Sequence, residues 1–393
     1  MNKTDRWLLP EGIEEVLPEQ AKRLEQLRRQ LLDMYDSWGY DLVMPPFIEY
    51  LESLLTGTGN DLDLQTFKLT DQLTGRLMGV RADMTPQVAR IDAHQLNRET
   101  PTRLCYMGTV LHTRTDGFAG SRSPLQVGAE LYGHAGIESD VEVMNLMLET
   151  LALSDVKNPF IDLGHVGIYR ELVKLAGLNR EQEATLFDCL QRKANTEIAE
   201  LLGEWKLDTS LAKALAELTR LNGDESVLAE AKTVLKKAGK GVMNALDELT
   251  SIATRIKQGK PEVTLHFDLA ELRGYHYHTG TVFAAYVAGQ GQAVAQGGRY
   301  DDIGAVFGRA RPATGFSTDL KTLLSLSMHK NNQVAAIFAP TDNDPDLHKY
   351  ISDLRLQGER VICALPGQKG SAKDMGCERE LTKTASGWQI KDL

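Results

Sequence analysis

Two short segments concentrate polar and aromatic side chains in the second half of the chain. Residues 272–283 carry one arginine, two tyrosines and two histidines, and residues 296–302 read Gln-Gly-Gly-Arg-Tyr-Asp-Asp. Side chains of these kinds hold small polar ligands by hydrogen bonding and ring packing. Taken alone, the glycines of the second segment fit a tight turn as well as a site. The two segments together favour a ligand pocket.

Other chemistry is less well supported. His276 and His278 alternate, so on a strand they share one face and could hold a metal ion. No third ligand follows at a standard spacing, which favours packing or pocket roles, and no metal is predicted. Residues 56–60 are glycine-rich but lack the Gly-Lys-Ser/Thr of a phosphate loop, so they are interpreted as a turn. The scattered cysteines have no activating histidine nearby in sequence, and no catalytic residue is predicted.

The first half of the chain predicts elements that could position such a pocket. Leu24, Leu27, Leu31 and Tyr35 recur at helical spacing, which predicts a helix over 18–38 that Gly39 ends. Thr85 before Pro86 predicts a helix start with the threonine as its cap. The remaining predicted elements are strands at 41–44, 76–80, 103–111, 125–132 and 160–163, and a helix at 138–153.

The second half changes composition. Residues of about 169–258 are rich in Ala, Leu, Glu and Lys, which predicts a helical insertion that serves as a scaffold or docking bundle. Gly367, Gly370, Gly376 and Gly387 suggest a loosely packed end. The chain is therefore predicted to be α+β, with a core at 1–329 and a short α/β unit at 330–393. The predicted elements are strands at 263–267, 281–287, 293–296, 334–338 and 360–364, and helices at 319–327 and 347–357.

Bulk properties exclude some classes of partner. The 393 residues carry a formal net charge of -10, which disfavours nucleic acid because phosphate binding needs clustered Lys and Arg. Four scattered cysteines form no disulfide framework. Neither a signal peptide nor a membrane span is evident. We expect a cytoplasmic protein.

The two segments, with residues 80–86 and 126–130, resemble the histidine-recognition elements of histidyl-tRNA synthetases over residues 7 to about 327. The resemblance implies a class II synthetase-like antiparallel sheet flanked by helices, and self-dimerisation through a first motif at 40–46. It also implies that Asp83 and Thr85 receive the α-ammonium of histidine. Asp83 alone could be a solvated loop carboxylate and Glu130 an ordinary strand residue, but matching motifs in order favour the pocket. The implied histidine-binding set is Asp83, Thr85, Gln126, Glu130, Arg273, Tyr277 and Tyr300.

The same resemblance shows where the chain departs from a synthetase. The two arginines that hold ATP in that family are replaced by His112 and Thr322, and Asp319 adds negative charge. Neither replacement can make the bidentate phosphate contacts of a guanidinium. Arg114 and Arg122 are interpreted as solvated loop charges. No cofactor is expected, and neither is tRNA binding.

The short C-terminal unit resembles a truncated anticodon-binding domain, because residues 334–338 look like its first strand and too little chain follows to complete it. A truncated, acidic relative with a retained amino-acid pocket resembles the regulatory subunits of ATP phosphoribosyltransferase, a paralogous family. This resemblance implies a non-catalytic chain that activates a short catalytic subunit in a hetero-octamer, at the first step of histidine biosynthesis, and mediates feedback inhibition by L-histidine. A divergent histidine-activating synthetase or amino-acid ligase is the alternative, and it predicts histidine-dependent pyrophosphate exchange. A scaffold with an empty pocket is a third possibility, and it predicts activation without histidine binding.

Overall fold

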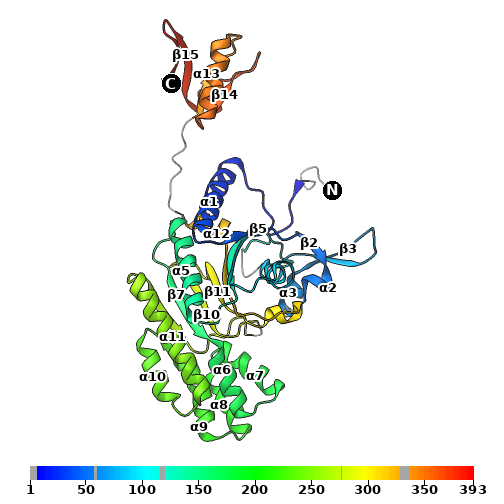
Figure 1. Ribbon diagram of the computed structural model, residues 1–393, viewed down its shortest axis with the longest axis vertical. Helices are drawn as coiled ribbons and strands as arrows, with labels where there is room; N and C mark the ends of the chain where they lie inside the picture. The colour runs from blue at the N-terminus through cyan, green and yellow to red at the C-terminus, as the bar shows by residue number, and fades with distance from the viewer. Residues whose placement is uncertain (1–6, 57–59, 116–119, 276, 328–335) are drawn as a thin grey trace. The chain divides into compact units, whose positions relative to one another are not determined.

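The computed structural model describes residues 7–56, 60–115, 120–275, 277–327 and 336–393. The chain divides into two compact units, Met1–Met328 and His329–Leu393 (Figure 1). None of the described helices is both long enough and apolar enough to cross a membrane.

The first unit is built on a mixed sheet of nine strands in the described residues, in the order β1-β5-β6-β12-β11-β10-β7-β9-β8. Neighbouring strands are antiparallel except for the pairs β1–β5 and β7–β9. The strand bounds are Asp41–Leu42 (β1), Thr102–Thr109 (β5), Leu125–Tyr132 (β6), Phe160–His165 (β7), Asn222–Gly223 (β8), Thr264–Asp268 (β9), Thr281–Tyr286 (β10), Ala295–Arg299 (β11) and Ala313–Asp319 (β12).

Three helices pack on one face of this sheet, namely α1 (Pro18–Ser37), α5 (Ile137–Leu153) and α12 (Leu320–Leu326). The apolar stripe predicted for α1 is confirmed, because Leu24, Leu27, Leu31 and Tyr35 are all buried. Gly39 adopts a positive φ of 80° just after the helix and donates its N–H to Asp36, as a helix-ending glycine does. The opposite face of the sheet is left for the candidate site.

A three-stranded sheet and a helical turn lie beside the N-terminal strands. The helix α4 (Thr85–Arg90) continues directly into a π-helical segment, Ile91–Leu96. The predicted threonine cap is wrong: Met84 is the N-cap, and Thr85 lies inside the helix with its hydroxyl 3.0 Å from that of Tyr106. The small elements here are β2 (Ile48–Tyr50), α2 (Leu51–Leu54), α3 (Asn60–Gln65), β3 (Phe67–Thr70), β4 (Leu77–Val80) and a 3-10 helix at Ile303–Phe307.

The segment between β7 and β9 is helical apart from a 3-10 turn and the two-residue strand β8, which the sequence did not predict. Its helices pack around buried leucines and isoleucines that are continuous with the main core, and they gather at one end of the first unit (Figure 1). The bounds are α6 (Val166–Ala176), α7 (Arg180–Gln191), α8 (Asn195–Glu204), α9 (Thr209–Glu217), a 3-10 turn at Leu218–Arg220, α10 (Ser226–Val234) and α11 (Lys240–Gly259).

The second unit has a sheet of its own, ordered β14-β13-β15-β16, and a small core around Ile337, Leu347 and Leu381. The predicted loose ending is wrong, because the final residues form an antiparallel hairpin, β15 with β16. The bounds are β13 (Ala336–Ala339), α13 (Pro345–Leu356), β14 (Val361–Cys363), a 3-10 turn at Lys373–Met375, β15 (Cys377–Thr384) and β16 (Gly387–Asp392).

Candidate functional site

A cavity of about 990 Å³ lies on the open face of the large sheet. Six of the seven candidate residues line it, and the seventh, Gln126, hydrogen-bonds to one of them. The strands place the lining side chains in rows. Glu130 on β6 pairs with Gly315 on β12, which pairs with Gly298 on β11. A second row, displaced by two residues along the strands, runs from Gly128 on β6 to Asp162 on β7.

Glu130 is the most deeply buried charge-bearing group of the cavity, with a relative exposure of 1%. Its carboxylate accepts a hydrogen bond of 2.9 Å from Tyr106 and another from Tyr300. Burial raises the pKa of this carboxyl to about 8, against the lowering effect of the two tyrosine donors. Without a ligand, Glu130 is therefore mostly protonated at neutral pH.

This pKa predicts how the stability of the free chain depends on pH. Between the unfolded-state pKa near 4.5 and the folded-state pKa near 8, the folded chain holds a proton on Glu130 that the unfolded chain releases. The free energy of unfolding should therefore fall as pH rises through this window. Glutamine does not titrate, so the free energy of unfolding of Glu130→Gln should not show this fall. Relative to the parent, it should therefore rise by about 2 kcal/mol between pH 6 and 8. Urea unfolding of both chains measures the difference, and parallel pH profiles would contradict the prediction.

The tyrosines above Glu130 leave one donor without a partner. Tyr277 stacks on Tyr300 with ring centroids 4.9 Å apart and an interplanar angle of 28°. Its hydroxyl is buried and has no hydrogen-bond partner among the described residues. Buried polar atoms are nearly always paired in native proteins, so this hydroxyl, which belongs to a residue that lines the cavity, is a candidate partner for a ligand atom.

Asp83 forms a second polar centre in the same cavity. Its carboxylate accepts hydrogen bonds from Gln126 at 2.7 Å and from the Thr85 N–H at 3.0 Å. The Thr85 hydroxyl lies 3.0 Å from that of Tyr106, which in turn donates to Glu130. The two carboxylates are thus joined by a continuous chain of hydrogen-bonding groups.

Arg273 lines the cavity but lies at its other end. Its guanidinium donates to the Tyr286 hydroxyl at 2.7 Å and pairs with Glu271 at 3.4 Å. Asp162 lies on this wall, held by His266 at 2.8 Å. Four strand-to-strand steps separate Glu130 from Asp162, or about 19 Å along the sheet. The Arg273 guanidinium thus has its partners at the Asp162 wall, whereas hydrogen bonds and ring stacking connect the other six residues around Glu130.

The positions where synthetases carry phosphate-holding arginines face the protein itself. The His112 ring nitrogen Nε2 lies 2.9 Å from the carbonyl of Ala82, and the Thr322 hydroxyl donates to Asp319 at 2.8 Å. Asp319 also caps α12 through its carboxylate. The interpretation of Arg122 as a solvated charge is wrong, since it donates to the carbonyls of His112 and Glu11. Arg114 is exposed.

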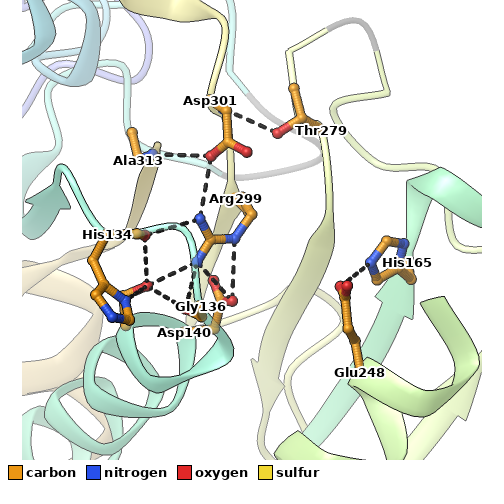
Figure 2. A network of polar contacts seen from close by, with 10 residues as sticks. His134, Gly136, Asp140, His165, Glu248, Thr279, Arg299, Asp301 and Ala313 are labelled. Carbon is orange, nitrogen blue, oxygen red and sulfur yellow. Dashed lines mark hydrogen bonds and ion pairs between the residues drawn. The ribbon is translucent and has the colours of Figure 1, made fainter. Parts of the chain in front are cut away.

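Arg299 holds the end of β11 that carries Tyr300, a role that sequence reasoning missed (Figure 2). Its buried guanidinium contacts Asp140 at 2.8 Å and Asp301 at 3.2 Å. Asp301 in turn accepts from the N–H of Ala313 and donates its own N–H to Thr279, which ties both motif segments together. The alternative of a turn at Gly297 and Gly298 is wrong, because both glycines lie inside β11.

The histidine pair considered for metal binding is only half described, because His276 lies outside the described residues. His278 lies outside any strand, with Nδ1 3.2 Å from the carbonyl of Arg273. Burial lowers the pKa of His278 to about 4, so this ring is neutral at physiological pH. Within the part of the chain that the structure describes, no group of three His, Cys, Asp or Glu residues could hold a metal ion.

Fold and site together define a protein of the histidyl-tRNA synthetase class. A family model described as histidyl-tRNA synthetase matches residues 12–323. A histidyl-tRNA synthetase from Nostoc sp. PCC 7120 shares the fold, with a TM-score of 0.78 at 19% identity, covering 98% of this chain and 95% of that one. A structure titled ATP phosphoribosyltransferase regulatory subunit/histidyl-tRNA synthetase, from Bacillus halodurans, gives a TM-score of 0.83 at 27% identity, covering 94% and 96% of the two chains.

Relatives that match the chain over its full length identify its family within this class. The ATP phosphoribosyltransferase regulatory subunit of Thioalkalivibrio sulfidiphilus is 64% identical over the whole of both chains, and that of Alkalilimnicola ehrlichii is 57% identical over 100% of this chain and 98% of its own. Residues 334–391 match a model described as the ATP phosphoribosyltransferase subunit HisZ C-terminal domain. The chain belongs to the family of ATP phosphoribosyltransferase regulatory subunits.

Proposed function

We propose that this chain is the histidine-sensing regulatory subunit of an ATP phosphoribosyltransferase, and that histidine binds between Glu130 and Asp83. The observation that carries the proposal is the unpaired, buried hydroxyl of Tyr277 beside a buried carboxylate. An imidazole ring has one N–H and one acceptor nitrogen at neutral pH. Glu130 accepts from the first nitrogen, and Tyr277 donates to the second.

The backbone end of the ligand has a matching partner. Asp83 bears a carboxylate at the cavity wall, held in place by Gln126 and the Thr85 N–H. A carboxylate oriented in this way suits the α-ammonium group through charge-assisted hydrogen bonds. Arg273 has its own partners at the far end of the cavity, so it is left out of this binding mode.

The charges around the cavity argue against ATP as a co-substrate. The described lining residues include a single guanidinium, that of Arg273, and four carboxyl groups, those of Asp83, Asp162, Glu271 and Glu130, the last of which is mostly protonated at neutral pH in the free chain. A triphosphate would meet net negative charge without the fixed cations that phosphoryl chemistry needs. The chain therefore senses histidine without activating it.

Regulation requires partners. The chain pairs with a short catalytic subunit, in a hetero-oligomer that family resemblance takes to be a hetero-octamer, and it binds no tRNA. Self-association through the motif at 40–46 is supported by exposed apolar side chains within it and directly after it: Leu42 is 41% exposed, Met44 80%, Phe47 42% and Ile48 44%. Histidine must bind the active and inactive assemblies unequally, with a coupling of about 1–3 kcal/mol.

The test is phosphoribosyl-ATP formation by a short catalytic subunit from the same source, titrated with this chain. We expect saturable activation, reduced by histidine roughly 5- to 150-fold at saturation. A flat titration would overturn the regulatory role. Activation that histidine leaves unchanged would instead favour a scaffold, and histidine-dependent pyrophosphate exchange would favour a synthetase.

A further inference from the structure

The segment that carries Tyr277 into the pocket is also fixed to the helical insertion, two residues earlier, by Tyr275. The segment connects β9 to β10 and turns at Gly274, whose φ is 62°. Tyr277 faces Tyr300 and the buried carboxylate, whereas Tyr275 packs among residues of α6 and α7. One short piece of chain thus contacts the candidate histidine site and the insertion at the same time.

Four residues of the insertion hold Tyr275, and we call these with Tyr275 the Tyr275 cluster. Its ring lies 5.2 Å from that of Tyr169 on α6 and 5.3 Å from that of Phe187 on α7. Its hydroxyl donates to Glu183 at 2.6 Å, and its carbonyl accepts from Arg170 at 2.7 Å. Tyr275 itself is 6% exposed. The ring, the hydroxyl and the backbone are therefore each fixed by α6 or α7, and a movement of the segment must displace these helices or break the cluster.

The helix α7 is also in direct contact with the cavity, because Phe187 and Gln191 line it. The Tyr169 hydroxyl donates to the Glu183 carbonyl at 2.8 Å, which joins α6 to α7 within the cluster. The two helices are therefore coupled to each other as well as to Tyr275. A ligand that pairs with the Tyr277 hydroxyl fixes the segment, and this constraint reaches α6 and α7 through Tyr275.

We infer that Tyr275 is a positioning residue that transmits histidine occupancy to the helices α6 and α7, which form the output of the sensor. This inference rests on the proposed function, because it takes histidine to be the occupant of the Glu130 pocket. Tyr275 also lines the cavity, but it contacts no histidine atom in this scheme. It acts through Tyr277 on one side and through Glu183 and Arg170 on the other.

The test is Tyr275→Phe, which removes the bond to Glu183 and keeps the ring. In the complex with the catalytic subunit, we expect the dissociation constant for histidine to stay within about threefold of the parent value, since the pocket groups are intact. The inhibition factor at saturating histidine should fall at least fivefold. Histidine should slow amide exchange in residues 166–191 of the parent complex, and this protection should be reduced in the variant.

The matched control is Thr219→Val, which removes a buried hydroxyl bond of 2.6 Å to Asn195 elsewhere in the insertion. It should inhibit like the parent. Parent-like inhibition in Tyr275→Phe would overturn the inference, and so would an equal loss in the control, which would point to general loosening of the insertion. Loss of histidine binding in Tyr275→Phe would also overturn it, because the Tyr275 hydroxyl would then contact the ligand directly. Failure of the parent chain to bind histidine would refute the proposed function itself. Calorimetry of the parent chain with histidine distinguishes this outcome from a failure of the inference about Tyr275.

Discussion

Histidine should bind about 100-fold more weakly when Glu130 is replaced by glutamine, a loss of roughly 3 kcal/mol. In the free chain Glu130 is mostly protonated at neutral pH, so glutamine copies both its shape and its charge. The fold should therefore tolerate the change. The bound state differs, because the imidazole N–H needs an acceptor that Tyr106 and Tyr300 do not already fill. A carboxylate has two oxygens with about four acceptor positions, whereas glutamine presents one oxygen and an NH₂ group.

Calorimetry of the full chain with histidine measures this loss. The matched control is Asp162→Asn, at the opposite end of the same cavity and bonded to His266. It removes one negative charge from the cavity lining without changing the proposed histidine-binding position, so the affinity for histidine should change less than about threefold. Equal losses in the two variants would mean that the cavity attracts histidine by its overall charge. Unchanged affinity in Glu130→Gln would place histidine elsewhere.

Much of the first unit could be predicted because its local signals agree with its tertiary role. The helical spacing of Leu24, Leu27, Leu31 and Tyr35 predicted α1, and the strands on either side of the loop at 113–122 match β5 and β6 within two residues. The C-terminal hairpin was missed because its glycines were given more weight than its pattern. Gly376 and Gly387 have positive φ angles at the strand starts, as turn glycines do, while Leu381 and Ile390 face each other across the hairpin.

The sequence predicted residues of which six line one cavity, but it did not predict their geometry. Spacing in the sequence cannot show that Arg273 turns towards Tyr286 and Glu271, since that choice depends on partners brought in by β9 and β10. The role of Arg299 depends in the same way on Asp140, which lies 159 residues earlier in the chain. Tyr106 and Tyr132 gave no motif signal of their own. They matter because β5 and β6 place them next to Glu130 and Tyr300.

Gly315→Ala should abolish detectable histidine binding and lower the free energy of unfolding by about 1–3 kcal/mol. A Cβ at this position would collide with Oε2 of Glu130 and would lie 2.8 Å from the carbonyl of Ala129. The backbone of β12 is ordinary strand here, so the cost is steric and falls on the carboxylate. Gly203→Ala in the last turn of α8 is the control, because a Cβ there meets nothing within 4 Å. It should leave binding unchanged and stabilise the chain by about 0.5 kcal/mol.

A double-mutant cycle separates the collision with Glu130 from general damage to β12. If the added methyl group acts by displacing the carboxylate, Gly315→Ala should cost much less stability in a Glu130→Ala background, where the side chain it meets has gone. The coupling between the two sites should then reach about 1–3 kcal/mol. Additive losses, measured by urea unfolding of the four chains, would mean that the methyl group disturbs the backbone near Ala129. In that case the sheet, and not the pocket, would require glycine at position 315. Strong coupling would instead show that glycine at this position leaves the space that the Glu130 carboxylate needs to face its ligand.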